Sequence, residues 1–507
     1  MPKALCMWTT LIDERLMQER IVVRNSLTGN KEPFSPLEKD LVRIYACGVT
    51  PYDECHIGHA MQAIFFDVIR NYLECFGYKV IYVRNFTDVD DKIIARAKAN
   101  GLAPNVLAER MIASSDEDMK ALGVRKASHE PKVSENIPEI QAMIHTLLAD
   151  ESAYVSSTGD VYFRVTKKDD YGKLSNRKTS ELRSRTRELT GSEEKEDPLD
   201  FALWKRDETE GASWDSPWGK GRPGWHIECS AMAKKYLGAS FDIHGGGRDL
   251  IFPHHENEIA QSEAANHAAY ASVWMHSGLL TVEQQKMSKS LGNFITIKAF
   301  LRDWHPEVLR FSYLQNHYGS NIDFSLDTFK QCRRRLFYYY ETLIELDQRA
   351  RTGAESANKD LSLAADERSL GEFLTAMHSS MRDDFNTAGA WGEINKLFRW
   401  LNQKLSQKDG LPLSLIEQIQ EKIKEISRIF GVLKEVPQSF VEEQRRKILL
   451  ELGFSSESEI ETAIKERALA REEKDWAKGD KIRDQLAERG IVLKDKGTAL
   501  SGWTFKF

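Results

Sequence analysis

The strongest constraint on the fold is a strand–helix–strand rhythm near the start of the chain. Residues 42–47 form a short, mostly apolar run that suits a strand. Apolar residues then recur at helical spacing over residues 60–76, and a second strand-like run covers residues 80–84. Strands that alternate with helices of this length are typical of a parallel sheet covered by crossover helices. The sequence therefore predicts an α/β domain, and the same rhythm resumes at Trp225.

A four-residue motif with two histidines, His56-Ile57-Gly58-His59, lies where the first strand is followed by the helix, and is called the histidine tetrad below. Backbone N–H groups at the start of such a helix can bind phosphate oxygens. A second motif, Lys286-Met287-Ser288-Lys289-Ser290, has two lysines and only one apolar residue. It suits a mobile flap that brings cationic groups to a polyphosphate. Together the two motifs predict a site for a phosphorylated substrate.

Composition is that of an ordinary globular protein. The chain has 507 residues, of which 41% are hydrophobic and 29% charged, so we expect two to four domains with ample core. Its net charge of -6 gives no overall attraction to nucleic acid, and any RNA binding would need local basic patches. We find no apolar run of membrane-span length and no secretory leader, and therefore expect a cytoplasmic protein. The six cysteines are far apart, which favours free thiols or metal ligands over disulfides.

Changes of pattern along the chain predict seven segments. A strand-like stretch at 159–163 and an acidic loop at 192–197 indicate an inserted domain. The α/β pattern then resumes with a strand at 241–244, a glycine turn at 245–247, and a helix from about His255 to Ala265. The expected boundaries are 1–40 for an N-terminal extension, 41–134 for the first half of the α/β domain, 135–222 for the inserted domain, 223–267 for the second half, 268–330 for the region of the flap, 331–440 for a helical bundle, and 441–507 for a last module of two helices followed by strands.

Residues that can bind a metal appear in a further group of motifs. Tyr45-Ala46-Cys47-Gly48 ends the first strand, and residues 221–230 contain Trp225, Glu228 and Cys229. His-Gly-Gly-Gly follows at 244–247, and Phe-Pro-His-His-Glu-Asn-Glu at 252–258. With the two earlier motifs, in this order over nearly the whole chain, they resemble bacterial-type cysteinyl-tRNA synthetases, which are class I aminoacyl-tRNA synthetases. The resemblance implies a Rossmann-type parallel sheet with an inserted domain, then a helical bundle and a small α+β C-terminal module.

The resemblance implies one Zn²⁺ per chain, with four ligands: Cys47, Cys229, His254 and Glu258. Two thiolates, an imidazole and a carboxylate are reasonable zinc ligands, and the i, i+4 spacing of the last two would place both on one helix face. Spacing alone leaves His255 and Glu256 as rival ligands, and the cysteines could simply be small core residues. A bound zinc would prefer a substrate thiolate to a serine hydroxyl, which would make an editing site unnecessary.

The resemblance also implies the reaction. L-Cysteine would attack the α-phosphorus of ATP, which comes with Mg²⁺, and the cysteinyl group would pass to the 3′ end of tRNA(Cys). Such chemistry depends on positioning and charge compensation. Thr87 and Trp225 match the amino-acid pocket, and Gly246 and Asp249 match positions beside the ribose. A turn cap, a core aromatic and a plain glycine turn are the structural alternatives. The catalytic positions around the triphosphate match His56, His59, Lys286 and Lys289, the last being the better candidate among the lysines.

For tRNA, the resemblance implies stem contacts from residues 268–330 and an anticodon-binding module at 441–507. Trp476, Asp480 and Arg483 match that module and would share one helix face at i, i+4 and i+7. The alternative is a core tryptophan beside two solvated charges. The basic run 333–335 before four aromatic residues fits a solvated helix face better than an RNA site. We expect a monomer.

Three features depart from the family pattern. Val49 and Pro51 replace a proline and a valine, Met61 stands where an arginine is common, and residues 1–19 extend beyond the usual start. Two other functions are possible. One is a relative that ligates cysteine to an amino sugar, which would lack a full anticodon module. The other is a non-catalytic zinc- and RNA-binding paralogue, which would be expected to have lost tetrad histidines or flap lysines.

Overall fold

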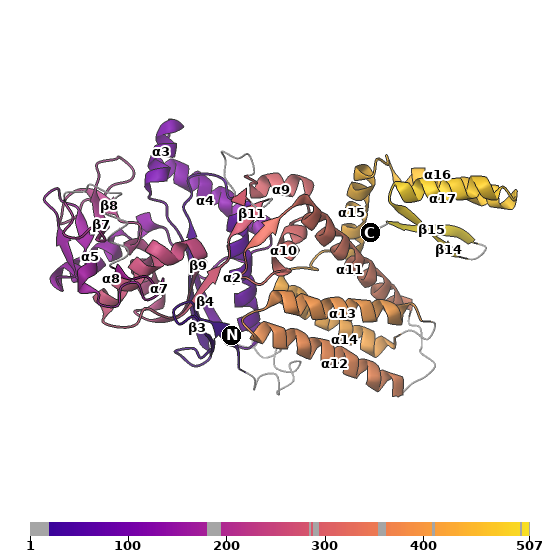
Figure 1. The fold of residues 1–507 in the computed structure, drawn as a ribbon, viewed down its shortest axis with the longest axis horizontal. Helices are drawn as coiled ribbons and strands as arrows, with labels where there is room; N and C mark the ends of the chain where they lie inside the picture. The colour runs from indigo at the N-terminus through magenta and orange to yellow at the C-terminus, as the bar shows by residue number, and fades with distance from the viewer. Residues whose placement is uncertain are drawn as a thin grey trace. The chain divides into compact units, whose positions relative to one another are not determined.

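The computed structural model describes residues 20–179, 194–282, 285–286, 294–352, 361–407, 411–496 and 499–505. The chain divides into two compact units, which are described one at a time. Unit 1 comprises Met1–Ser325, Asp366–Leu397 and Lys424–Val432, and unit 2 comprises Leu326–Ala365, Phe398–Ile423 and Leu433–Phe507. Figure 1 shows the path of the chain through both units.

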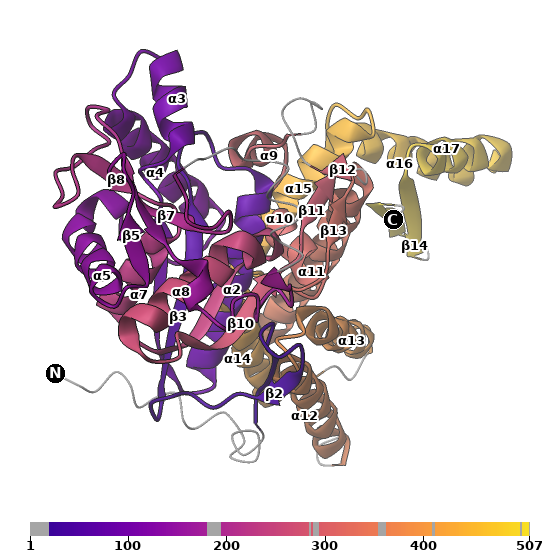
Figure 2. The same cartoon turned by 60° about the vertical axis from the view of Figure 1, so that its left-hand side comes forward.

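Unit 1 is built on the parallel sheet that the sequence predicts. Its order is β10 (Ala271–Ser277), β9 (Phe241–Gly247), β3 (Leu41–Val49) and β4 (Lys79–Phe86), and every neighbouring pair is parallel. Helix α2 (Ile57–Cys75) connects β3 to β4 and packs against the sheet (Figures 1 and 2). The two strands and the helix expected over residues 42–84 are therefore confirmed, as is the α/β fold class.

The glycine turn expected at residues 245–247 is wrong, because β9 continues through all three glycines. A Cβ on Gly245 would lie 2.0 Å from the Phe66 ring of α2, and one on Gly246 would lie 2.6 Å from the His255 ring. These glycines let a helix and a histidine approach the strand closely. After β9 the chain passes through the wide turn η4 (Ile251–His255) into α8 (Glu256–Asn266), close to the expected helix.

A second, antiparallel sheet belongs to the inserted part of the chain. Its order is β5 (Ala153–Val155), β6 (Val161–Phe163), β7 (Phe201–Arg206) and β8 (Gly221–Pro223). The strand expected near residue 160 is β6, and the acidic loop expected at 192–197 lies partly outside the described residues. Helices α3 (Asp91–Ala99), α4 (Pro104–Ala121) and α5 (Ile137–Ala149) precede this sheet, and α7 (Ile227–Leu237) follows it and packs on β3 and β4.

The remaining elements of unit 1 form a hairpin, a small three-stranded sheet and several helices. Strands β1 (Val22–Arg24) and β2 (Lys31–Pro33) form a hairpin, while β11 (Leu280–Val282) pairs with β12 (Gln285–Lys286) and β13 (Ile322–Phe324). Helices α9 (Ile297–Asp303) and α10 (Pro306–Leu314) pack against α2. Helices α12 (Leu361–Arg382), α13 (Thr387–Leu405) and α14 (Leu413–Phe430) contribute residues to both units.

Unit 2 pairs a long helix with the C-terminal module. Tyr340 on α11 (Leu326–Thr352) stacks on Phe440 of α15 (Pro437–Glu451), with ring centroids 4.0 Å apart. Arg333 is buried and donates to Glu451 at 2.7 Å, so this member of the basic run has a structural role. Helices α16 (Glu457–Glu472) and α17 (Trp476–Glu488) pack together, and β14 (Ile491–Lys496) forms a hairpin with β15 (Ala499–Phe505).

Helix α15 begins before residue 441 and ends after it, and the expected segment boundaries stay predictions. Across the described part of the chain, helices long and apolar enough to span a bilayer are absent.

Candidate functional site

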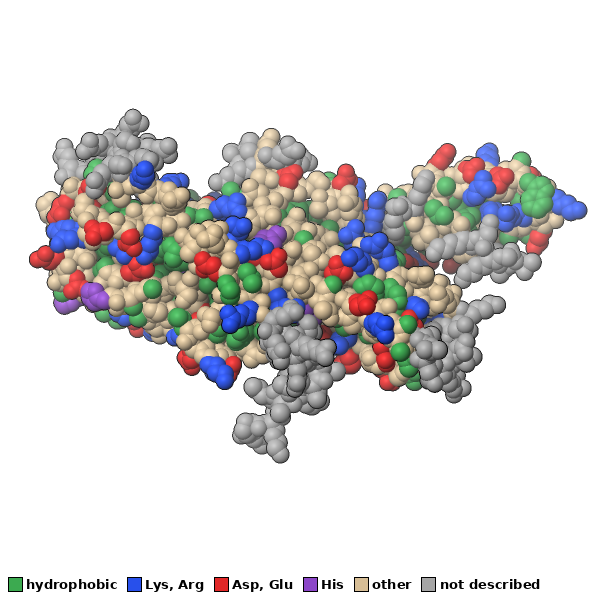
Figure 3. All heavy atoms as spheres, turned by 60° about the horizontal axis from the view of Figure 1, so that its bottom comes forward, with side chains coloured by type: hydrophobic (Ala, Val, Ile, Leu, Met, Phe, Trp, Pro, Cys, Tyr) green, Lys and Arg blue, Asp and Glu red, His purple; other side chains and the backbone are tan. Residues whose placement is uncertain are grey.

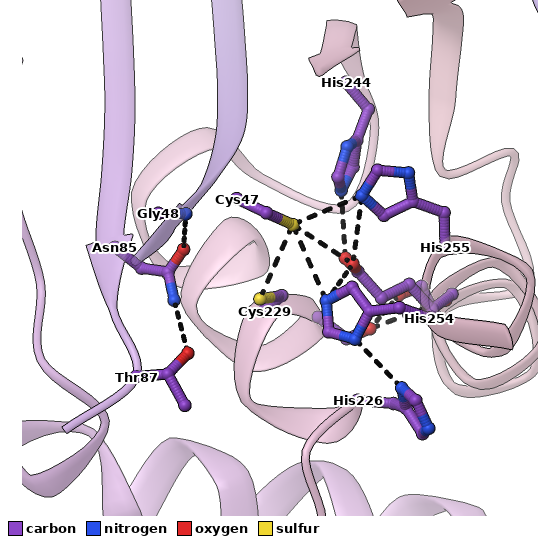
Figure 4. A network of polar contacts seen from close by, with 12 residues as sticks. Cys47, Gly48, Asn85, Thr87, His226, Cys229, His244, His254 and His255 are labelled. Carbon is purple, nitrogen blue, oxygen red and sulfur yellow. Dashed lines mark hydrogen bonds and ion pairs between the residues drawn. The ribbon is translucent and has the colours of Figure 1, made fainter. Parts of the chain in front are cut away.

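Four metal-type side chains converge near the end of β3, and Figure 4 labels three of them, Cys47, Cys229 and His254. They come from four elements: Cys47 from β3, Cys229 from α7, His254 from η4 and Glu258 from α8. All four are buried, and one ligand atom of each lies within 4.8 Å of the others. The parallel sheet and its flanking helices therefore assemble a site from residues that lie far apart in the sequence.

The distances within this cluster suit one small cation. Cys47 Sγ lies 3.9 Å from Cys229 Sγ, 3.6 Å from His254 Nε2 and 3.5 Å from Glu258 Oε1. His254 Nε2 lies 3.0 Å from Glu258 Oε1. The two sulfurs are too far apart for a disulfide. Two thiols, an imidazole and a carboxylate around a common centre are the donor types that hold zinc, so the residues fit this metal.

A neighbouring histidine fixes how His254 presents its ring. His226 Nδ1 lies 2.9 Å from His254 Nδ1, and burial lowers the pKa of His226 well below its usual value. The Nδ1 atom of a neutral His226 ring can accept a hydrogen bond from the Nδ1–H of His254. This contact leaves His254 Nε2 directed at the cluster, as expected for a metal ligand with an outer hydrogen-bond partner.

The structure separates the two rival ligands. The Glu256 carboxylate accepts hydrogen bonds from the backbone N–H groups of Leu174 and Ser175, at 3.3 and 2.8 Å, and so supports the inserted part. His255 remains a geometric rival, because its Nε2 lies 3.3 Å from Cys47 Sγ. A second group that could hold an ion accordingly consists of Cys47, His244, His255 and Glu258.

Charge within the cluster is closely balanced. The hydrogen bond from Cys47 lowers the pKa of the Cys229 thiol to about 6, although burial opposes it. Burial raises the pKa of Cys47 well above its usual value. Burial alone would lower the pKa of His254, but Glu258 and Cys229 raise it to about 10. The metal-free cluster thus favours one thiolate and one carboxylate with a protonated imidazole, and a cation would displace protons from such a set.

The histidine tetrad occupies the start of α2. His56 is the N-cap residue, and its Nδ1 accepts from the N–H of Gly58 at 3.0 Å, while His59 Nδ1 accepts from the N–H of His56 at 3.3 Å. The two rings stack with centroids 3.7 Å apart. Burial lowers the pKa of His59 to about 3, so this ring is neutral near pH 7. Because Nδ1 of each ring accepts, the proton of the neutral ring lies on Nε2, which becomes a hydrogen-bond donor.

A cavity of about 380 Å³ connects the tetrad to the metal-type residues. Its lining includes eight of the residues that the sequence predicts: Cys47, His56, His59, Thr87, Trp225, Cys229, Asp249 and His254. Trp225 is 41% exposed and its ring lies 4.4 Å from that of His254, so it is not a core aromatic. The Thr87 hydroxyl accepts from the amide of Asn85 at 3.4 Å. One open space therefore borders both the thiol-binding and the phosphate-binding candidates.

Other predicted residues lie elsewhere. Gly246 is buried against His255 and is not among the described residues that line the cavity, whereas its neighbour Gly247 is. Lys286 belongs to β12, which pairs with β11. Lys289 lies outside the described residues.

Gln62 and Asn85 are among the polar side chains of the cavity that sequence reasoning missed. Asn85 Oδ1 accepts from the N–H of Gly48 at 2.9 Å and so joins β3 to β4. Its place directly after a predicted strand is the only signal that the sequence offers. Gln62 Nε2 donates to the carbonyl of Cys47 at 2.7 Å, a contact that no motif announces.

In unit 2 the three predicted tRNA contacts lie on α17. Trp476 is 60% exposed, which rules out a core role for its ring. Asp480 and Arg483 are exposed as well, and Arg483 Nη1 lies 2.9 Å from Asp480 Oδ1. An aromatic ring and two polar side chains are thus open to a partner on this helix.

Comparison with known proteins gives matches over most of the chain. The family described as "tRNA synthetases class I (C) catalytic domain" matches residues 33–334, the DALR domain matches 376–434, and the "Cysteinyl-tRNA ligase anticodon binding domain" matches 457–500. The cysteine–tRNA ligase of Desulfotalea psychrophila is 44% identical over 488 residues, which cover 96% of this chain and 99% of that protein. The cysteine–tRNA ligase of Geobacter metallireducens is 46% identical over 475 residues, or 93% and 97%.

Solved structures show the same fold at low identity. Mycobacterium tuberculosis methionyl-tRNA synthetase with methionyl-adenylate is 14% identical, with a TM-score of 0.57 over 81% of this chain and 91% of that one. The Agrobacterium radiobacter K84 agnB2 LeuRS ternary complex is 10% identical, with a TM-score of 0.59 over 82% and 86%. With its catalytic, DALR and anticodon-binding matches in order, this chain belongs to the cysteine–tRNA ligases, enzymes of the class I aminoacyl-tRNA synthetases.

Proposed function

We propose that the chain activates L-cysteine with ATP and transfers the cysteinyl group to tRNA(Cys), with Zn²⁺ selecting the substrate by its thiolate. The observation that carries this proposal is the shared cavity, which borders the metal-type residues Cys229 and His254 as well as His56 and His59. Selection of the amino acid and reaction at the phosphate can thus occur while cysteine and ATP are bound in the same cavity. The family membership supplies the reaction class, and the cluster supports the mode of selection.

Cys47, Cys229, His254 and Glu258 would hold the zinc, one ion per chain. When bound, zinc would supply a soft Lewis acid that prefers a thiolate to a hydroxyl and so separates cysteine from serine. The chain's own residues then define the rest of the pocket. Thr87 and Trp225 border the space next to the cluster and would enclose the small side chain.

The tetrad would stabilise charge on the triphosphate. The Nε2–H donors of His56 and His59 would bind phosphate oxygens as charge develops at the α-phosphorus, and the dipole of α2 would add positive potential there. Lys286 and Lys289 would add positive charge from the flap, and Mg²⁺ would accompany the ATP. Gly246 and Asp249 would lie beside the ribose of ATP. The glycine would allow His255 to pack closely, and the aspartate would contact the ribose.

The tRNA would meet both units. Residues 268–330 would contact its stem, and Trp476, Asp480 and Arg483 would contact anticodon bases. Every proposed metal ligand and substrate contact comes from one chain, which supports a monomer. As an enzyme that would charge tRNA, it would work in the cytoplasm. An amino-sugar ligase is disfavoured by the anticodon-binding match at 457–500.

Cysteine-dependent exchange between ATP and pyrophosphate, followed by charging of tRNA(Cys), tests the proposal. Serine should be activated at least roughly a thousandfold less efficiently in kcat/KM, which corresponds to about 4 kcal/mol. Weaker discrimination would contradict selection by thiolate ligation, and so would full activity in a protein that contains no zinc.

A further inference from the structure

Two acceptor oxygens from different elements converge beside Gly247. If Gly247 carried a Cβ, that atom would lie 2.5 Å from Asp249 Oδ1 and 4.0 Å from Gln62 Oε1. Because Gly247 has no side chain, the Asp249 carboxylate can approach the strand here, and the Gln62 oxygen lies nearby. All three residues line the large cavity. The turn after β9, at residues 248–250, and the second turn of α2 thus present a pair of acceptors to the cavity.

The orientation of the Gln62 amide follows from its hydrogen bond. Nε2 donates to the Cys47 carbonyl at 2.7 Å, and a carbonyl can only accept, so the nitrogen must face it. The amide oxygen therefore points away from β3. Gln62 also lies three residues after His59, which places both on the same face of α2.

This pair of acceptors suits a particular ligand chemistry. Phosphate oxygens are acceptors and would be repelled here, whereas the donors of His56 and His59 attract them at the start of the helix. A vicinal diol offers two adjacent O–H donors and can satisfy two acceptors at once. The ribose of ATP carries such a diol.

We infer that Gln62 and Asp249 each accept a hydrogen bond from one ribose hydroxyl of ATP, and that Gln62 is a specificity-determining residue for the nucleotide. The inference rests on the proposed use of ATP in this cavity and on the ribose contact of Asp249, and adds the second acceptor. The Gln62 amide would thus accept from the ribose with its oxygen while its nitrogen donates to the carbonyl of Cys47. One side chain would contact both the nucleotide and the strand that carries a proposed metal ligand.

The test compares ATP with 2′-deoxy-ATP and 3′-deoxy-ATP in cysteine-dependent pyrophosphate exchange. The unaltered protein should prefer ATP to the analogue that loses the Gln62 contact by roughly threefold to tenfold in kcat/KM, the range of one neutral hydrogen bond, and to the analogue that loses the Asp249 contact by roughly tenfold to a hundredfold, because a carboxylate accepts more strongly. Gln62→Met should abolish the preference against one analogue and Asp249→Ala the preference against the other. Gln62→Met should change the KM for cysteine less than it changes the preference among the nucleotides.

Two further variants sharpen the test. Gln62→Glu keeps an acceptor oxygen but cannot donate to Cys47, and should retain the preference for ATP. Gln141 also donates to a backbone carbonyl, that of Asp215 at 2.8 Å, and Gln141→Met should leave all three nucleotides unaffected.

An equal loss with all three nucleotides in Gln62→Met would overturn the inference, and so would a rise in the KM for cysteine alone. An unaltered protein that is active but indifferent to the deoxy analogues would also overturn it while sparing the proposed function. Absence of any cysteine-dependent exchange would instead refute the proposed function itself.

Discussion

Cys229 and Cys332 are both buried thiols, yet their surroundings differ sharply. Burial raises the pKa of Cys332 to about 12, whereas Cys229 lies against Cys47 and its pKa falls to about 6. We predict that Cys229→Ser lowers zinc content and cysteine activation together, because it removes one of four ligands. Metal analysis and pyrophosphate exchange on the same preparation measure both. Cys332→Ser is the matched control and should change neither; stoichiometric zinc in an active Cys229→Ser protein would refute the ligand assignment.

Asp118 on α4 carries a carboxylate that the fold desolvates without a partner for Oδ2. Burial raises its pKa from 3.8 to about 6, with Lys298 opposing and Glu54 adding to the shift. The folded state therefore binds this proton more tightly than the unfolded state does. The contribution of Asp118 to stability is therefore most favourable below the pKa of the unfolded chain. It falls as the pH rises towards the pKa of the folded protein, and above that pH the buried charge lowers the free energy of unfolding by about 2–3 kcal/mol.

We predict that Asp118→Asn raises the free energy of unfolding by about 2–3 kcal/mol near pH 8, and by under about 1 kcal/mol near pH 4, because the charge is already neutralised there. Urea unfolding at both pH values measures it. Asp116→Asn on the same helix, whose partner Lys126 is largely exposed, should shift stability by at most about 1 kcal/mol. A gain that does not depend on pH would argue against titration of Asp118.

Among single residues, the sequence predicted those site residues that belong to a motif. Cys47, Cys229, His254 and Glu258 are brought together as expected, although His255 lies as close to Cys47 and spacing could not have excluded it. Gln62 could not be found, because its role depends on a contact between α2 and the end of β3 that only the folded chain provides.

Among the elements, helix α10 contacts α2 at two points. Tyr313 donates its hydroxyl to the carbonyl of Ile57 at 2.5 Å, next to the tetrad. Arg310 is fully buried, pairs with Asp67 of α2, and donates to the Phe430 carbonyl at 2.6 Å. One helix thus fixes both the start and the middle of the helix that carries His56 and His59.

We predict that Arg310→Met destabilises the protein by about 3–5 kcal/mol, because it leaves the Asp67 charge buried without its partner. Chemical denaturation followed by circular dichroism measures the loss. Lys31→Met is the control: its ion pair with Asp383 is exposed on both sides and should be worth under about 1 kcal/mol. Similar losses in the two variants would mean that burial does not set the value of the Arg310 pair.

The elements also show where pattern reasoning succeeds. Apolar periodicity predicted β3, α2 and β4, because each must bury one face or both against the sheet. It failed at Gly245–Gly247, where the glycines serve close packing with Phe66 and His255 instead of a change of direction. A glycine run has no side chain to distinguish these cases, and the packing partners lie far away in the sequence.

For the whole molecule, the net charge of -6 predicts that RNA contacts are local, and Figure 3 shows acidic and basic side chains mixed over the face it presents. On α17, Trp476 is 60% exposed beside Asp480 and Arg483. An exposed indole contributes little to core packing, so Trp476 is available for the proposed stacking on a base.

We predict that Trp476→Ala raises the KM for tRNA(Cys) roughly fivefold to a hundredfold, since stacking on one base is worth about 1–3 kcal/mol. Pyrophosphate exchange should stay unchanged, because α17 belongs to unit 2 while the cavity lies wholly in unit 1. Leu469→Ala on α16 removes a side chain that is 58% exposed and is the matched control, expected to leave charging intact. Asp480→Ala should blunt discrimination between anticodon variants of the tRNA. If Trp476→Ala charged tRNA(Cys) as well as the unaltered chain, or lost pyrophosphate exchange, α17 would have to serve stability and not the anticodon.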